Sequence, residues 1–436
     1  MARRPSPPRP ETVPGLPARR AALKLLDAVL RRGEPLELAL HGAAQGLPRE
    51  DRALAHAIAA EVLRHLPDLD ALIDGATRQV LPDDAKARMV LRIALAQTLK
   101  LDTPAHAAIA TALPLVDGGP RKLVHGVFGT VTRAEPTLPD PPTLPAEVAE
   151  RWAAQWGETM PVEAARAYAM RPPVDVSLRD PDETAKWTAE LQGETLAAGH
   201  VRLLSFADQG GAAIPTLPGF ADGAWWVQDI AASCAARLLG AGDGRAALDL
   251  CAAPGGKTMQ LAAAGWTVTA VDQSKKRLER LSDNLARTGL SAAIVQADLR
   301  QWAPDEPADA ILLDAPCSAT GIYRRHPDVL HRIGPRQIEE LAELQGELLA
   351  RAAAWLKPGG ALVYATCSLE RAEGEEQIAR FLADHRDFAV EPARAEELPE
   401  GVTPTSEEWV RTLPDCLADR GGTDGFFIVR MRKKAN

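Results

Sequence analysis

The sequence predicts a multidomain protein with an all-helical N-terminal domain, a small α+β insert and a C-terminal α/β domain. Apolar residues recur at helical spacing through residues 18–134, and Glu135–Pro145 then holds five prolines, which is typical of a linker. Beyond residue 219, short apolar runs alternate with amphipathic segments, as in an α/β domain. We therefore expect a disordered tail at 1–17, helices at 18–134, a linker at 135–145, the insert at 146–218 and the α/β domain at 219–436.

The composition indicates an ordinary globular protein, because 46% of the residues are hydrophobic and 25% are charged. No apolar run is long enough to span a bilayer, so we expect no membrane partner. Met1–Pro17 is rich in proline and arginine without an apolar stretch, which excludes a signal peptide. The five cysteines lack the spacing of a metal site or a disulfide framework, which predicts a cytoplasmic location and no bound metal.

The net charge of −9 is unevenly distributed. Residues 1–140 carry 19 Lys+Arg against 16 Asp+Glu, whereas the remainder carries 31 against 43. Binding to a nucleic acid would therefore depend on local basic patches, although for each patch taken alone a solvated surface is the better explanation. The candidates are Arg19/Arg20, Arg31/Arg32, Lys275/Lys276/Arg277/Arg280, Arg324/Arg325 and Arg430/Arg432/Lys433/Lys434.

The N-terminal helices are marked by apolar spacing and by helix-breaking residues. The first follows Ala21, Leu25, Leu26, Val29 and Leu30. Glycines and prolines at 33, 46, 67, 82 and 104 separate the segments, of which Asp51–Leu66, Ala85–Leu101 and one opening at Arg121–Val127 are the clearest.

The insert is expected to contain a few short strands. Pro173–Arg179 alternates apolar and polar residues, and Val201–Phe206 is a second candidate strand. Trp152 and Trp156 lie one helical turn apart before the insert, and we interpret them as core residues rather than as platforms for stacking bases.

The α/β domain is predicted to begin with a ligand-binding loop. The apolar run Ala246–Leu250 ends at the segment Cys251-Ala252-Ala253-Pro254-Gly255-Gly256-Lys257, which a helical pattern follows. Adjacent glycines let the backbone approach a ligand, and the helix N-terminus offers free N–H groups. The loop matches neither the dinucleotide fingerprint nor the P-loop. Val268–Asp272 then predicts a second strand, whose terminal acid is suited to gripping ribose hydroxyls.

Further polar residues follow the remaining strands. Ile294–Asp298 ends in an acid, Ile311–Asp314 leads to Cys317, and Ala361–Thr366 leads to Cys367. Ligands of open α/β sheets bind outside the carboxyl ends of the strands, so these side chains should share one crevice with Asp272 and the glycine loop. Asp424–Arg430 is expected to close the sheet as an antiparallel edge strand.

Together these motifs resemble the RNA cytosine-C5 methyltransferases that use S-adenosylmethionine (SAM). The likeness runs from about Val174 to Arg432, and its most specific feature is the pairing of Pro316-Cys317-Ser318 with Thr366-Cys367-Ser368. It implies a Rossmann-like SAM-dependent domain and makes the insert similar to an RNA-recognition extension. Residues 18–134 resemble the NusB-like RNA-binding domain of the ribosomal small-subunit methyltransferase B group, although that group usually has asparagine where His125 stands.

The resemblance also implies roles for individual residues. Cys367 would attack C6 of cytosine, Cys317 would assist product release, and Asp314 would hold N3. Arg324, Arg325 and Lys257 would contact the RNA, and Lys257 could also pair with Asp314. The cofactor would be held by Cys251, Ala252, Ala253, Pro254, Gly255, Gly256, Lys257, Asp272, Asp298 and Asp314.

Several alternatives stay open. Asp298 could instead cap a helix, and each cysteine could be a small buried hydrophobic residue. Cys251, Cys234 and Cys416 are expected to be unreactive, and Ala319 stands where a glycine is more usual. Ribosomal RNA of the small subunit is the leading substrate, with transfer RNA as the runner-up. A non-catalytic RNA-binding or ribosome-assembly factor on the same fold is the alternative from another class.

Overall fold

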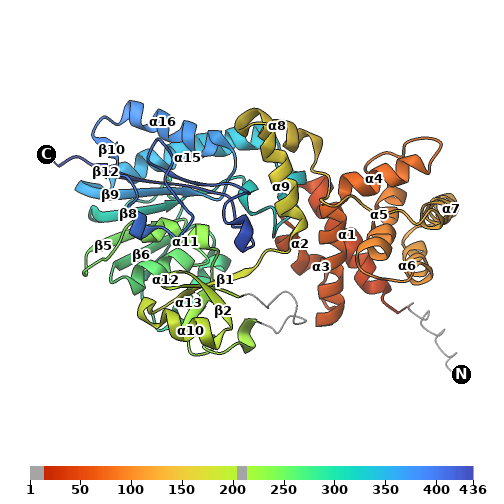
Figure 1. Ribbon diagram of the computed structural model, residues 1–436, viewed down its shortest axis with the longest axis horizontal. Helices are drawn as coiled ribbons and strands as arrows, with labels where there is room; N and C mark the ends of the chain where they lie inside the picture. The colour runs from red at the N-terminus through yellow and green to blue at the C-terminus, as the bar shows by residue number, and fades with distance from the viewer. Residues whose placement is uncertain (1–13, 204–213, 436) are drawn as a thin grey trace, which may run out of the picture. The chain divides into compact units, whose positions relative to one another are not determined.

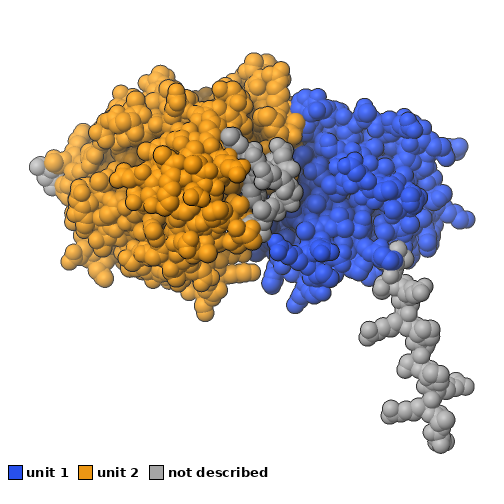
Figure 2. Space-filling view, turned by 60° about the horizontal axis from the view of Figure 1, so that its bottom comes forward, with its two compact units in different colours: residues 1–149, 326–332 blue, residues 150–325, 333–436 orange. Residues whose placement is uncertain are grey.

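The computed structural model describes residues 14–203 and 214–435 of the chain (Figure 1). It contains two compact units (Figure 2). The first runs to Ala149 and also includes His326–Arg332; the second comprises Glu150–Arg325 and the chain from Ile333 onward. His326–Arg332, expected in the α/β domain, therefore packs with the helical unit instead.

The first unit is all-helical, as predicted. Its central helix is α5, which contacts α1, α3, α4, α6 and α7 and is buried on every side from Ala87 to Gln97. Arg92 in α5 is buried and pairs with Asp70 of α4 at 2.7 Å, so its charge is neutralised inside the unit. The helices are α1 (Leu16–Arg32), α2 (Leu36–Ala43), α3 (Arg49–Arg64), α4 (Leu66–Gly75), α5 (Lys86–Lys100), α6 (Ala105–Ala112) and α7 (Gly119–Arg133), with the 3₁₀ turn η1 (Leu113–Leu115).

The expected disordered tail lies largely outside the described residues, and α1 begins at Leu16, inside the range 1–17.

The segment His326–Arg332, which packs with the helical unit, contains the short helix α14 (Val329–Arg332). Asp328 accepts a hydrogen bond from the Leu36 N–H at 3.3 Å, and His331 Nε2 lies 2.7 Å from the Leu63 carbonyl oxygen. None of the helices in the described ranges has the length and apolar character needed to cross a bilayer.

The second unit contains a small antiparallel sheet with strand order β2-β3-β1-β4. Its strands are β1 (Val174–Leu178), β2 (Gly193–Ala197), β3 (His200–Leu203) and β4 (Trp225–Val227), and α10 (Thr184–Glu190) packs on it. β4 lies beyond the expected end of the insert at residue 218. Of the expected strand Val201–Phe206, the last three residues lie outside the described part.

The main sheet has eight strands, with order β10-β12-β9-β8-β5-β6-β7 and β11 paired to β12. The strands β5 to β9 run parallel, and β12 is antiparallel to β9. β12 is not the edge strand that the sequence predicts, because β10 and β11 both pair with it. The strands are β5 (Ala246–Leu250), β6 (Thr267–Asp272), β7 (Ala293–Gln296), β8 (Ala308–Asp314), β9 (Leu356–Thr366), β10 (Phe388–Val390), β11 (Val410–Thr412) and β12 (Phe426–Lys433).

Helices cover both faces of this sheet (Figure 1). Ala310 and Leu312 of β8 point toward one apolar core, and Ile311 and Leu313 toward the other, as the two-residue period of a strand requires. The helices are α8 (Ala146–Trp156), α9 (Thr159–Ala169), α11 (Ile230–Arg237), α12 (Gly256–Ala263), α13 (Lys275–Thr288), α15 (Pro335–Ala354) and α16 (Glu375–Asp384). The chain turns from β5 toward β6 and β7 on one side, while β8 and β9 lie on the other. The strand order thus reverses between β5 and β8, where such sheets bind ligands.

Candidate active site

The loop after β5 is shaped by left-handed backbone positions. Cys251 has φ of 63° and Gly255, which precedes α12, has φ of 106°. A Cβ on Gly255 would also lie 2.9 Å from Leu281 Cγ, so a larger residue would be both strained and crowded there. The loop therefore turns sharply at the carboxyl end of β5 and leads directly into the first turn of α12.

Asp272, the last residue of β6, holds two neighbouring segments. Its Oδ2 accepts a hydrogen bond from the Ala253 N–H at 3.2 Å, and its Oδ1 accepts from the Ser274 N–H at 2.8 Å. The side chain is buried, and Arg277 Nη1 lies 3.4 Å from Oδ2. The sequence analysis placed Arg277 only in a surface patch, because nothing in the sequence shows that it reaches back to this acid.

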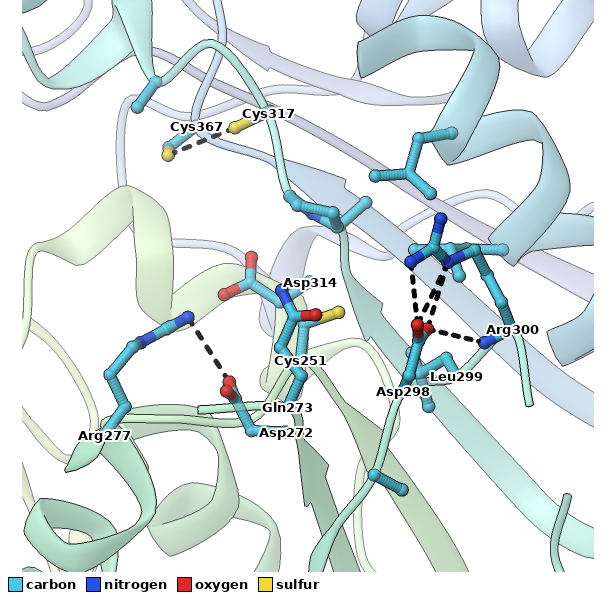
Figure 3. A pocket seen from close by; sticks show the side chains of 16 residues that line it. Cys251, Asp272, Gln273, Arg277, Asp298, Leu299, Arg300, Asp314, Cys317 and Cys367 are labelled. Atoms are coloured by element: carbon cyan, nitrogen blue, oxygen red, sulfur yellow. Dashed lines mark hydrogen bonds and ion pairs between the residues drawn. The ribbon is translucent and has the colours of Figure 1, made fainter. Parts of the chain in front are cut away.

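Asp298 lies two residues beyond the end of β7. Its carboxylate and that of Asp272 line one cavity (Figure 3). It accepts a hydrogen bond from the Arg300 N–H at 3.0 Å and pairs with the Arg300 guanidinium at 2.7 Å. The hydrogen bond from Arg300 lowers the pKa of Asp298. The structure does not form the alternative helix cap, because no helix begins directly after Asp298 in the part of the chain that the structure describes; the acid orders a turn and lines a cavity.

Asp314, the last residue of β8, forms an ion pair with Lys257 at 2.8 Å. Burial opposes the charge of Lys257, but Asp314 outweighs it, and the charge of Cys367 acts in the same direction, so the pKa of Lys257 is raised. Of the two roles expected for Lys257, the structure forms the ion pair with Asp314. A cation therefore lies beside both the acid and one of the two cysteines.

The two cysteines face each other with their sulfur atoms 3.5 Å apart (Figure 3). Cys317 follows β8 and Cys367 follows β9, and both are half-buried. The hydrogen bond with Cys367 raises the pKa of Cys317, and burial and nearby negative charge raise it further. The two thiols are therefore unequal, since one is held neutral and the other lies near a lysine.

Two cavities meet at this point. The first, of about 330 Å³, is lined by Cys251, Asp272, Asp298, Cys317 and its neighbours. The second, of about 500 Å³, is lined by the small sheet's Trp226, by Phe426 and by the loop residues Ala252, Ala253, Pro254, Gly256 and Lys257. Asp314 and Cys367 line both cavities. Of the loop residues expected to hold the cofactor, only Cys251 lines the first cavity.

The two arginines expected to contact RNA differ. Arg324 is buried, and it donates to the carbonyl oxygens of Thr423 at 2.9 Å and Gly421 at 2.7 Å. This contradicts the expectation that Arg324 contacts the RNA, because its guanidinium holds the chain before β12. Arg325 is partly exposed and lines the second cavity, where it pairs with Asp229 at 3.2 Å.

Burial keeps the other three cysteines in the thiol form. Burial raises the pKa of Cys234 to about 12 and that of Cys416 to about 11, and burial likewise raises the pKa of Cys251. A thiol with a raised pKa is a poor nucleophile at neutral pH. Within residues 14–203 and 214–435, no group of three or more His, Cys, Asp or Glu side chains is placed to hold a metal ion.

Two family models match the chain. Residues 236–432 match the model described as 16S rRNA methyltransferase RsmB/F, and residues 16–133 match the NusB family. Both matches agree with the resemblances drawn from the sequence.

Curated relatives are similar over nearly the whole chain. The ribosomal RNA small subunit methyltransferase B of Klebsiella pneumoniae subsp. pneumoniae is 35% identical, covering 96% of this chain and 98% of the relative. The protein of the same name from Xanthomonas campestris pv. campestris is 36% identical over 88% of this chain and 91% of its own.

Solved structures share the fold. The crystal structure of PH0851 has a TM-score of 0.74 at 24% identity, covering 97% of this chain and 99% of that one. NSun6 from Pyrococcus horikoshii with SFG has a TM-score of 0.57 at 20% identity, covering 67% of this chain and 99% of that one.

Proposed function

The chain belongs to the RsmB/F family of 16S rRNA methyltransferases, and from that premise we propose how its own residues methylate C5 of cytosine. The reaction is SAM-dependent RNA methylation, which the family membership establishes. The proposal concerns the residues that carry it out and the RNA that they act on. The observation that carries it is that Asp314 and Cys367 line both cavities, while Cys317 lines the first and Lys257 the second.

We assign the first cavity to the cofactor. Its volume of about 330 Å³ falls within the range of roughly 300–1,000 Å³ that is usual for small-molecule sites. The buried carboxylate of Asp272 is suited to ribose hydroxyls, and the outer carboxylate of Asp298 is suited to the adenine amino group. When bound, SAM supplies an electrophilic methyl group on a sulfonium. Cys251 of the loop lines this cavity, whereas Ala252, Ala253, Pro254, Gly256 and Lys257 line the second one.

We assign the second cavity to the target cytosine. C5 of cytosine is a weak nucleophile, and addition of a thiolate to C6 moves the C5–C6 electron pair onto C5. Cys367 is the proposed attacking residue, because it lines both cavities and lies beside the Lys257 cation, which stabilises a thiolate.

Asp314 is proposed to hold N3 of the ring. Protonation or hydrogen bonding at N3 withdraws electrons and favours addition at C6. The ion pair with Lys257 fixes the carboxylate at the rim shared by both cavities. After attack, the C5 electron pair forms the bond to the methyl carbon, and the methyl–sulfur bond of the cofactor breaks.

Cys317 is proposed to complete the reaction. The methylated adduct must lose its C5 proton, after which the C5–C6 double bond re-forms and the Cys367 sulfur leaves C6. Once Cys367 is bonded to carbon it is neutral and no longer opposes ionisation of its neighbour, so Cys317 can release its proton to solvent, and the resulting thiolate then accepts the proton from C5. The raised pKa of Cys317 in the free protein, caused first by its hydrogen bond with Cys367, supports this order of events.

The proposed substrate is small-subunit ribosomal RNA, which the names of the relatives support. The cytosine would enter from a single-stranded or flipped-out position, since a paired base cannot reach the sulfurs. Arg325 at the second cavity and the NusB-like helices would contact the RNA. A cytoplasmic site of action follows from that substrate. The NusB family match argues against transfer RNA, the runner-up.

Mass spectrometry tests the proposal. The purified protein is incubated with SAM and, separately, with small-subunit ribosomal RNA and with transfer RNA, and nucleosides are then analysed. We expect 5-methylcytidine in the ribosomal RNA alone, and bisulfite sequencing would locate it. Methylation of transfer RNA alone would overturn the substrate assignment, and no product with either RNA would support the non-catalytic alternative.

A further inference from the structure

A single buried carboxylate connects the two loops that carry Cys317 and Cys367. Each cysteine is followed by a serine, and both serine hydroxyls donate to Glu373 Oε2, that of Ser368 at 2.5 Å. The other oxygen, Oε1, accepts from the Ser318 N–H at 2.8 Å and from Gln345 Nε2 at 2.9 Å. Glu373 lies in the 3₁₀ turn η5 (Arg371–Glu373), and Gln345 lies in α15.

The cluster is closed to solvent. Ser368, Glu373 and Gln345 have no exposed surface, and Ser318 is 1% exposed. Its four hydrogen-bond donors to the carboxylate are all neutral groups, so no cation compensates the charge directly. A buried carboxylate is costly unless its acceptor positions are filled, and here each oxygen receives two hydrogen bonds. The arrangement is therefore stable only while both cysteine loops keep their present positions.

Further bonds hold the loop that links Cys367 to Glu373. Ser368 Oγ also accepts from the Glu370 N–H at 3.0 Å. The Glu370 carboxylate accepts hydrogen bonds from Arg151 Nε at 3.0 Å and from Trp152 Nε1 at 3.1 Å. The loop after Cys367 thus cannot shift without breaking bonds at both of its ends.

On the basis of the proposed function, we propose that Glu373 is a positioning residue that fixes the two cysteine sulfurs relative to each other. The reaction needs this, because Cys367 must reach C6 while Cys317 reaches the proton on the adjacent carbon, C5. Two sulfurs 3.5 Å apart can contact the two bonded ring atoms C6 and C5 at once. If the two loops moved independently, one of these contacts would be lost.

The charge of Glu373 supports the separate roles proposed for Cys367 in attack and Cys317 in release. It adds to the effects of the Cys367 hydrogen bond, burial and the Cys367 charge in raising the pKa of Cys317. The positive charge of Lys257 interacts with Cys367 instead. The carboxylate therefore opposes ionisation of Cys317, the proposed release residue.

The test compares Glu373→Ala and Glu373→Gln with the matched control Glu397→Gln. Glu397 is also a carboxyl with little exposed side chain in the same unit, but it pairs with Arg430 at 2.8 Å and contacts neither cysteine loop. The first readout is the rate at which diamide, which takes two electrons and two protons from a pair of thiols, forms a Cys317–Cys367 disulfide without RNA or cofactor. The second is the kcat and the KM for SAM.

We expect Glu373→Ala to slow disulfide formation and to lower kcat by about 10- to 100-fold, because misplaced reacting groups cost rates of this order. The KM for SAM should stay within a few-fold, since Glu373 does not line the first cavity. Glu373→Gln keeps acceptors for Ser318 N and Gln345 and should recover most of both rates. The control should match the wild-type protein.

A double variant, Ser318→Ala/Ser368→Ala, keeps the test decisive if Glu373→Ala does not fold. It removes both hydroxyl links while leaving Glu373 and the cysteines in place, so it should show the same two defects. Wild-type rates in Glu373→Ala, or in the double variant, would overturn the proposal. Since the disulfide readout needs no RNA, a wild-type protein without methylation activity would count against the proposed function alone.

Discussion

The sulfur atoms of Cys317 and Cys367 lie 3.5 Å apart although fifty residues separate them in the chain. Their strands explain this, because β8 and β9 are parallel neighbours and Asp314 pairs in register with Ala365. Each cysteine then follows within three residues of that pair. The sheet therefore delivers both thiols to one edge, beside Asp314.

The role of Asp272 predicts a loss of cofactor affinity in Asp272→Ala. Removing a carboxylate that accepts hydrogen bonds from the ribose should weaken SAM binding by about 1.5–3 kcal/mol. Isothermal titration calorimetry measures this, with Asp309→Ala as the control. Asp309 is an acid on the same sheet that pairs with Lys357 and lines neither cavity. Equal affinity in a folded Asp272→Ala protein would remove Asp272 from the cofactor site.

The neighbouring arginines should respond differently to substitution. Arg325→Ala should weaken RNA binding and reduce the slope of log K against log salt by about one, as expected for one lost phosphate contact. Arg336→Ala, which removes an exposed arginine of α15, is the control. Arg324→Ala should instead lower the melting temperature, because it removes buried hydrogen bonds. Unchanged RNA affinity and salt slope in Arg325→Ala would exclude that contact.

The buried acid Asp249 of β5 should make stability depend on pH. Its side chain is fully buried, and burial raises its pKa to about 7 although it accepts a hydrogen bond from Thr258 at 2.5 Å. The folded form thus keeps a proton that the unfolded chain releases near pH 4, so stability falls as pH rises from about 4 to about 7.

Asp249→Asn tests this effect. The amide carries no charge to bury, so the variant should gain melting temperature over the wild-type protein at pH 8 and show little gain at pH 4. Differential scanning calorimetry of the second unit's transition measures the difference. A gain of the same size at both pH values would mean that Asp249 does not titrate on unfolding.

Much of the site was predictable because it follows regular elements. Apolar runs locate the strands, and Asp272, Asp314, Cys317 and Cys367 follow directly from their ends. The NusB family match and the RsmB/F match confirm the two resemblances drawn from these segments.

Other features depend on contacts between distant residues, which no local pattern reveals. Arg324 and Arg325 are adjacent in the sequence, yet one is buried against Gly421 and Thr423 and the other reaches a cavity. Glu373 stands in a charged stretch that is typical of a surface, and only the fold brings it to Ser318. His326–Arg332 follows the loop that carries Cys317 in the sequence, but the structure packs it with the helical unit.

The central claim is that the two cysteines act at opposite ends of one reaction. Cys367→Ala cannot form the adduct, so it should be inactive and should leave no covalent RNA. Cys317→Ala can still attack and transfer the methyl group, but it should then stall before release. The double variant should form no complex, because attack precedes release.

Denaturing gel electrophoresis after incubation with RNA and SAM tests this claim most directly. Our account predicts a protein–RNA complex that survives denaturation in Cys317→Ala, and no such complex in Cys367→Ala or in the double variant. A trapped complex in Cys367→Ala instead would reverse the two roles while keeping covalent catalysis. No trapped complex in either single variant would contradict the release role of Cys317.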